Sequence, residues 1–136
     1  MRFEFDIAEG DFNKAGTASS KVKQILKELG VPLNLIKRTT VAMYEAEINV
    51  VAHAHGGGRL VVSVDLNQVR VEVTDHGPGI QNIAMAMEEG FSTASPKVVS
   101  MGFGSGMGLP NIRRNADDLN ISSTTSGTKV TITNYI

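Results

Sequence analysis

Residues 69–80 read Val-Arg-Val-Glu-Val-Thr-Asp-His-Gly-Pro-Gly-Ile. The first half alternates valine with polar residues, which is typical of a strand with one buried face. The second half, residues 75–80, places an aspartate and two glycines directly after that strand. A carboxylate at a strand end can accept a hydrogen bond from an exocyclic amine, and glycine lets the backbone approach a flat ring. An ordinary Asp-Gly-Pro turn is the competing interpretation of this stretch.

A second glycine-bearing segment, residues 102–108, reads Gly-Phe-Gly-Ser-Gly-Met-Gly and precedes a predicted helix. Glycines at alternate positions expose backbone N–H groups, and the following helix adds a positive end, so the segment suits phosphates. It is not a Walker A loop, because no Gly-Lys-Ser/Thr follows it, and no strand precedes it as in a Rossmann fingerprint. A flexible linker is the alternative for this segment.

Residues 33–54 predict a long, largely buried helix that carries a polar stripe. Glu45, Asn49 and His53 are spaced so that they share one side of it. Burying a carboxylate and a carboxamide costs several kcal/mol unless they find partners. Such a pair can hold Mg²⁺ or orient a water or hydroxyl group, and a solvated stripe is the alternative. We expect Glu47 to lie at the surface or to contribute to packing, and His53 to cap the last carbonyls of the helix.

The order of elements predicts an α+β two-layer sandwich, a mixed but mainly antiparallel sheet with helices on one face. Neighbouring strands are joined by hairpins, which favours antiparallel pairing. The expected strands are residues 2–7, 60–64, 69–73, 119–124 and 128–133, with turns at Asn67-Gln68 and Ser126-Gly127. The expected helices are residues 11–29, with Asp11 as N-cap, 33–54, 82–89 and 109–117.

Size and composition favour one soluble domain over residues 1–136. The charge is balanced, at 13 basic against 14 acidic residues, and gives no reason to expect a nucleic-acid or anionic-membrane partner. Cysteine is absent, which excludes disulfides and thiolate metal sites. No segment has the length of a membrane span or the apolar run of a signal peptide, so we expect a cytoplasmic protein.

Taken together, these segments resemble the GHKL ATPase superfamily, which includes gyrase, Hsp90, histidine kinases and MutL. Residues 45–49 resemble its N box, residues 75–80 its G1 box, residues 104–109 its G2 box, and Gly127-Thr128 its last motif. The match covers nearly the whole chain. It implies the Bergerat ATP-binding fold, with ATP and Mg²⁺ as cofactors.

The chain resembles one branch of the superfamily more than the others. The short length and the Glu-x-x-x-Asn spacing of the N box resemble the anti-sigma factor serine kinases of the RsbW and SpoIIAB type. Residues 86–93 and 108–114 are more similar still to the switch kinases of the RsbT type. A histidine kinase pathway module is a third, more distant resemblance.

The resemblance implies a role for each matching residue. Glu45 would act as general base toward a serine or threonine hydroxyl, and Asn49 would coordinate Mg²⁺. Asp75 would bind the adenine amine, with a water shared with Thr128. The remaining residues would shape the pocket: Gly77, Gly79 and Ile80 on the adenine and ribose side, and Gly104, Ser105, Gly106, Met107, Gly108 and Leu109 around the phosphates. Residues 89–103 would form the ATP lid.

The resemblance also implies partner proteins, and the chain departs from the family pattern at one position of the lid. The implied substrate is a STAS-domain antagonist protein, with a sigma factor or a phosphatase as second partner, and relatives often form homodimers. The anti-sigma kinases carry a lid arginine where this chain has Gly104, and Lys97 is the one basic residue of the lid. A nucleotide-dependent binding protein that sequesters its partner without catalysis is therefore the second hypothesis.

Overall fold

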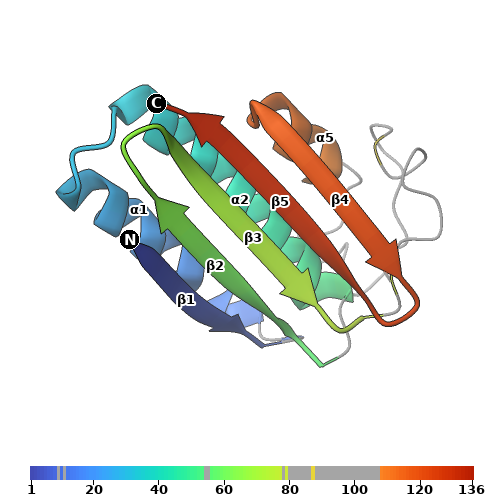
Figure 1. Cartoon of the computed structure of the whole chain (residues 1–136). Coiled ribbons are helices and arrows are strands. Elements are labelled where there is room, and N and C mark those ends of the chain that lie inside the picture. Colours follow the sequence, from blue (N-terminus) through green and yellow to red (C-terminus); the bar gives the residue numbers. More distant parts are fainter. Residues whose placement is uncertain (9, 11, 54–55, 78, 80–86, 88–107) are drawn as a thin grey trace.

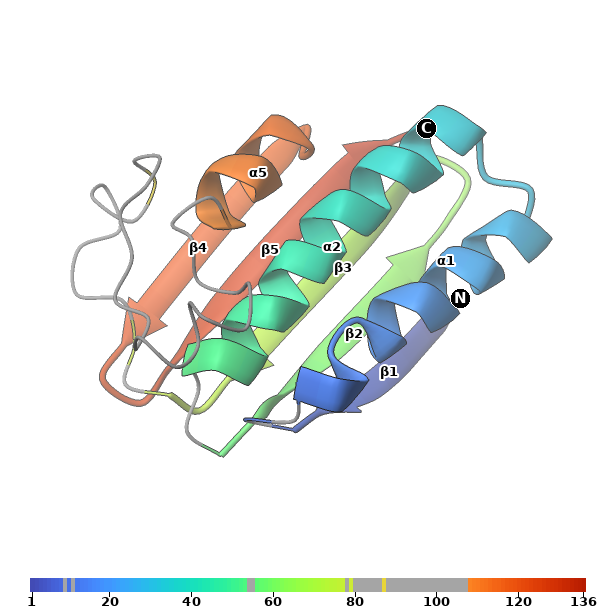
Figure 2. The ribbon, with the colours of Figure 1, turned by 180° about the vertical axis from the view of Figure 1, so that it is seen from behind.

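The computed structural model describes residues 1–8, 10, 12–53, 56–77, 79, 87 and 108–136. These residues form two layers, a five-stranded sheet and helices that cover one of its faces (Figure 1, Figure 2). The strands are β1 (Arg2–Ile7), β2 (Gly58–Val64), β3 (Gln68–Asp75), β4 (Asp118–Thr124) and β5 (Gly127–Tyr135). The helices are the 3-10 turn η1 (Phe12–Lys14), α1 (Thr17–Glu28), α2 (Leu33–His53) and α5 (Gly108–Arg114).

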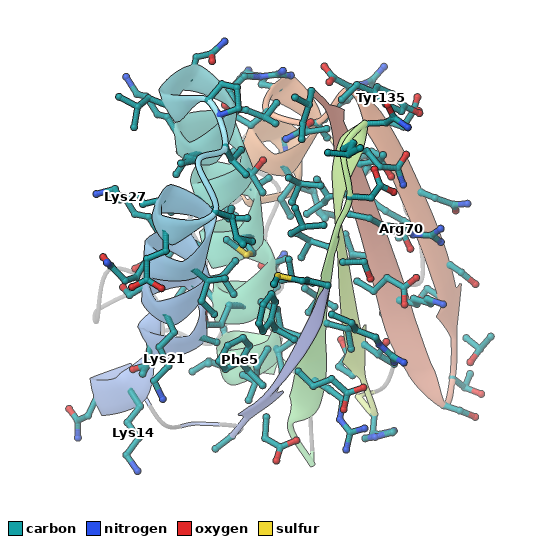
Figure 3. All side chains as sticks on the ribbon, turned by 60° about the vertical axis from the view of Figure 1, so that its left-hand side comes forward. Phe5, Lys14, Lys21, Lys27, Arg70 and Tyr135 are labelled. Carbon is teal, nitrogen blue, oxygen red and sulfur yellow. The ribbon has the colours of Figure 1, made fainter. Side chains whose placement is uncertain are left out.

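The sheet has the order β1-β2-β3-β5-β4, and every pair of neighbours is antiparallel. The alternation in β3 places Val71 and Val73 on the helix side, where they are 0% and 2% exposed. Figure 3 shows Phe5 between the sheet and the helices, and Arg70 on the opposite face. That outer face carries ion pairs such as Lys129 with Glu72. The predicted α+β class with helices on one face is confirmed.

Helix α2 lies across the middle of the sheet and is the centre of the core (Figure 2). Ala42 and Met43 are fully buried, and Val50 contacts the start of β2 at Gly58. The predicted burial of this helix is confirmed, and its bounds agree with the prediction as far as His53. Residue 54 and the side chain of His53 lie outside the described residues.

The prediction for the first helix was wrong at its start. Helix α1 begins at Thr17, not near residue 11, and Gly16 before it has a φ of 87°. This left-handed conformation interrupts the helix, and η1 occupies the preceding residues. The proposed N-cap Asp11 lies outside the described residues.

The N-terminus of α1 is capped by Glu47 of α2, which is 3% exposed. Its carboxylate accepts hydrogen bonds from the amides of Gly16 and Ser19 at 3.0 and 2.9 Å and from the Ser19 hydroxyl at 2.7 Å. The amide of Ala18 lies 3.4 Å from the same group. Of the two expected roles for Glu47, surface or packing, the surface position was therefore wrong. Its role is to join the two helices through the positive end of α1.

Replacing Glu47 by alanine should lower the free energy of unfolding by about 3 kcal/mol, because buried amides and a hydroxyl lose their charged acceptor. Urea unfolding followed by circular dichroism measures this loss. Glu28→Gln on exposed α1 surface is the matched control and should stay within about 0.5 kcal/mol of wild type. A Glu47→Ala protein as stable as that control would contradict the capping role.

Smaller differences concern element ends. Helix α5 stops at Arg114, before the predicted residue 117, because the buried Asn134 side chain draws the next turn toward β5. It accepts from the Asp117 amide at 2.7 Å and donates to the Asn115 carbonyl at 3.0 Å. The turn before β3 covers residues 65–67, where Asp65 accepts from the amides of Asn67 and Gln68.

Several predicted features lie outside the described residues. They are Ile80, the helix at residues 82–89 apart from Met87, the ATP lid at residues 89–103, and Gly104, Ser105, Gly106 and Met107. Among the described helices, none combines the length and apolar character needed to cross a membrane.

Candidate functional site

The predicted site residues that the structure describes lie on elements that meet at one end of the two layers. The C-terminal end of α2, the end of β3 and the hairpin between β4 and β5 lie together there in both views (Figure 1, Figure 2). Asp75 and Thr128 come from the strands, and Glu45 and Asn49 come from α2. The antiparallel pairing of β3 with β5 therefore brings the G1 stretch beside the last motif.

Asp75 ends β3, and its carboxylate is held by the following turn and by the start of β5. Its Oδ1 accepts hydrogen bonds from the Gly77 amide at 3.0 Å and from the Thr128 amide at 3.1 Å. A Cβ on Gly127 would lie 2.1 Å from the Asp75 carbonyl oxygen, so only glycine lets β5 start here. Both hydrogen bonds reach the same oxygen, Oδ1.

Gly79 shows why the G1 stretch needs glycine. Its φ is 82°, and a Cβ there would lie 2.1 Å from the Thr124 carbonyl oxygen. The turn after β3 therefore packs directly on the end of β4. A side chain at this position would collide with the backbone of β4, which explains why the position needs glycine.

Thr128 is 7% exposed and contributes through its backbone. Its amide donates to Asp75, while its hydroxyl is paired with that of Ser123 at 2.8 Å. A direct hydrogen bond therefore joins Thr128 to Asp75. The adenine contact of Asp75 and the water shared with Thr128 stay predictions.

Asn49 and Gly108 bring the N box and the end of the second glycine segment together. A Cβ on Gly108 would lie 3.1 Å from Asn49 Oδ1 and 3.4 Å from its Nδ2. The bare glycine thus lets the backbone at the start of α5 approach the carboxamide. The adjacent Leu109 is 7% exposed and belongs to the core, so only its backbone is left for a ligand.

Glu45 lies one helical turn before Asn49 and is half-buried. Burial raises the pKa of its carboxyl above the ordinary value, and a hydrogen bond from Asn111 opposes that rise. The Asn111 Nδ2 atom donates to Glu45 Oε1 at 3.3 Å. A carboxylate with a raised pKa is a stronger base than an ordinary one, which suits it to accept a proton.

Sequence reasoning gave no role to Asn111 or Ser123 and missed the capping role of Glu47. Asn111 reaches Glu45 from 66 positions away, a separation that no local pattern reveals. Ser123 is the hydroxyl partner of Thr128. Glu47 could have been found, because it follows the buried Met43 by four residues and shares its face of the helix.

Comparison with known proteins agrees with this geometry. The family model described as Histidine kinase-like ATPase domain matches residues 9–134. The chain is 30% identical over 105 residues to the serine/threonine-protein kinase RsbT of Bacillus subtilis, covering 74% of this chain and 72% of the relative. It is 27% identical to the anti-sigma F factor of Caldanaerobacter subterraneus subsp. tengcongensis, covering 88% of this chain and 83% of the relative.

Solved structures share the fold. The RsbU and RsbW domains of a Mycobacterium tuberculosis protein match with a TM-score of 0.68 and 18% identity, over 98% of this chain and 32% of that one. A mycobacterial sensor histidine kinase, MprB, matches with a TM-score of 0.57 and 16% identity, over 99% of this chain and 97% of that one. The chain belongs to the family of histidine kinase-like ATPase domains.

Proposed function

We propose that the chain binds ATP with Mg²⁺ and transfers the γ-phosphate to a serine or threonine hydroxyl of a partner protein. The observation that carries this proposal is the close approach of Gly108 to the Asn49 carboxamide. This approach brings together the Asn49 oxygen, proposed to bind Mg²⁺, and the last glycine of the segment proposed to bind phosphates. The Glu45 carboxylate lies one helical turn before Asn49. Family membership and the relative named as a serine/threonine-protein kinase support it.

Asp75 is the proposed adenine contact. Two amides hold its Oδ1, so the carboxylate keeps one orientation and Oδ2 can accept from the exocyclic amine. Gly77 and Gly79 would face the ring and ribose, together with Ile80. Because a carboxylate only accepts, this contact would select an amine over a carbonyl at that position of the base.

Asn49 is the proposed magnesium ligand. Its carboxamide is half-buried and faces a glycine that leaves room beside its oxygen, so the residues present fit a bound cation. Amide and phosphate oxygens are ligands that Mg²⁺ accepts. The bound ion would neutralise phosphate charge. We place the phosphates against Gly104, Ser105, Gly106, Met107 and Gly108, with Leu109 contributing only backbone.

Glu45 is the proposed general base. It takes the proton of the substrate hydroxyl, whose oxygen forms a bond to the γ-phosphorus while the bond between that phosphorus and the β–γ bridging oxygen breaks. ADP leaves, and the proton stays on Glu45 until it returns to solvent. The raised pKa of this carboxyl makes it a better proton acceptor than an ordinary carboxylate.

Glu45 is reached through a groove of about 620 Å³ between α1 and α2. Three lysines line it, Lys23 and Lys27 of α1 and Lys37 of α2. The groove also presents Leu33, which is 74% exposed, and Tyr44, which is 40% exposed. Its positive charge and apolar surface favour an acidic face of the partner protein as the occupant.

Reversing two charges of this groove, in Lys23→Glu with Lys27→Glu, should raise KM for the partner by about tenfold or more, because like charges then meet. The Kd for ATP should not change. Steady-state transfer at varied partner concentration measures this. Lys21→Glu is the matched control, since Lys21 is also exposed on α1 but does not line the groove. An equal effect of both changes would refute docking in the groove.

The partner is proposed from the relatives. One is named an anti-sigma F factor and another a serine/threonine-protein kinase. We therefore propose a STAS-domain antagonist as substrate, in a cytoplasmic partner-switching circuit with a sigma factor or a phosphatase as second partner. A homodimer is part of the same proposal.

A second candidate function is nucleotide-dependent sequestration of the partner without catalysis. The absence of an arginine before Ser105 favours it, since phosphoryl transfer depends on charge neutralisation around the phosphate. Glu45→Gln separates the two functions. Partner regulation that survives this change would assign the role to binding.

The kinase proposal is tested by mixing the chain with a cognate STAS-domain protein, Mg²⁺ and γ-labelled ATP. We expect acid-stable label on a serine or threonine of that protein. An acid-labile product would point to histidine, and bound ATP without transfer would remove the kinase proposal.

A further inference from the structure

A chain of side-chain hydrogen bonds leads from the end of α5 to Glu45. The Arg114 guanidinium donates through Nη1 to Asn111 Oδ1 at 3.2 Å. Asn111 then donates through Nδ2 to Glu45 Oε1 at 3.3 Å. The backbone carbonyl of Asn111 accepts from Asn115 Nδ2 at 2.8 Å, which holds the last turn of the helix. The carboxamide of Asn111 therefore connects Arg114 of α5 to Glu45 of α2.

The chemistry of the two neighbours fixes the orientation of that carboxamide. A guanidinium can only donate, so the Asn111 oxygen must face Arg114. An ionised carboxylate can only accept, so the Asn111 NH₂ group must face Glu45. Turning the amide over would set donor against donor and acceptor against acceptor. Arg114 thus orients Asn111, and Asn111 orients Glu45.

We propose that Asn111, oriented by Arg114, is a positioning residue that fixes the Glu45 carboxylate for proton transfer. This inference rests on the proposed role of Glu45 as base. Asn111 occupies Oε1, which leaves Oε2 for the substrate proton. A neutral donor also favours the ionised form and counteracts the effect of burial on the pKa of Glu45.

The position of Asn111 on α5 relates its hydrogen bond with Glu45 to the approach of Gly108 to Asn49. Asn111 lies three residues after Gly108, which faces Asn49, so one short helix lies against both Glu45 and Asn49 of the N box. Placement of α5 against α2 therefore sets the distance between the proposed magnesium ligand and the phosphate segment. The same placement sets the orientation of the base.

The kinetic test compares Asn111→Asp and Asn111→Ala with wild type. Aspartate has the shape of asparagine but cannot donate to Glu45, so a packing role would tolerate it. We expect both changes to lower kcat by about tenfold, the size of one hydrogen bond to a charged group, with KM for ATP and partner within about twofold. Asn120→Asp, on an exposed position of β4, is the control and should keep wild-type kcat.

A spectroscopic test accompanies the kinetics. The side-chain NH₂ signal of Asn111 in a ¹⁵N-correlated NMR spectrum should move in Glu45→Ala and stay in place in Glu28→Ala. Wild-type kcat in Asn111→Asp, or an amide signal indifferent to Glu45→Ala, would overturn the positioning role. Absence of transfer by the wild-type chain would instead overturn the proposed function, so the two failures are distinguishable.

Discussion

Replacing Glu45 by glutamine is expected to lower the rate of phosphoryl transfer by about 10³-fold, within the range for loss of a general base. Glutamine keeps the size of the side chain and can still accept from Asn111, so the half-buried position stays filled. What disappears is the ability to take a proton from the substrate hydroxyl. Single-turnover transfer at saturating ATP measures this rate without interference from product release.

The same variant should bind ATP with a Kd within about twofold of wild type, because Glu45 is not assigned to the nucleotide. Glu28→Gln, an exposed change of the same kind on α1, is the control and should transfer phosphate at the wild-type rate. Transfer by Glu45→Gln at the wild-type rate would exclude Glu45 as base. Weakened ATP binding would instead place Glu45 among the nucleotide contacts.

Replacing Asp75 by asparagine is expected to raise the Kd for ATP by about 100-fold. The Oδ1 atom of asparagine can keep the hydrogen bonds from Gly77 and Thr128, so the loops stay in place. The NH₂ group then replaces Oδ2 and faces the exocyclic amine, donor against donor. Losing a charged hydrogen bond costs about 1.5–3 kcal/mol, which agrees with the expected change in Kd. Calorimetric titration with ATP and Mg²⁺ measures it.

The chain offers a matched control for this change. Asp65, before β3, also accepts two backbone amides through Oδ1, those of Asn67 and Gln68. Asp65→Asn should therefore keep its two backbone hydrogen bonds as Asp75→Asn keeps its own, while ATP affinity stays at the wild-type value. If both variants bind ATP equally well, adenine is not recognised by Asp75.

The elements of the fold could be predicted because their sequence patterns are local. Alternating valines determine which face of β3 is buried, and the apolar run of α2 determines its place in the core. The start of α1 could not be predicted, because it depends on Glu47, which is 31 residues from Gly16. The end of α5 depends in the same way on Asn134, which is 19 residues from Asn115.

The candidate site likewise contains residues that a local sequence pattern predicts and contacts that it does not predict. An ordinary turn was an open alternative for the stretch with Asp75 and Gly79, and the order and spacing of all the motifs favoured a site there. Asn49 stood out because it shares a helical stripe with Glu45. The contact of Asn111 with Glu45 could not be predicted, because it exists only once α5 packs against α2. Long-range side-chain partners are a product of packing, and no spacing in the sequence encodes them.

The most direct test of the central claim is a crystal structure of the chain with Mg²⁺ and a non-hydrolysable ATP analogue. We predict the adenine amine within hydrogen-bonding distance of Asp75 Oδ2, the Asn49 oxygen on Mg²⁺, and the γ-phosphate on the side of Glu45. A nucleotide bound elsewhere, or one whose adenine does not reach Asp75, would contradict the account.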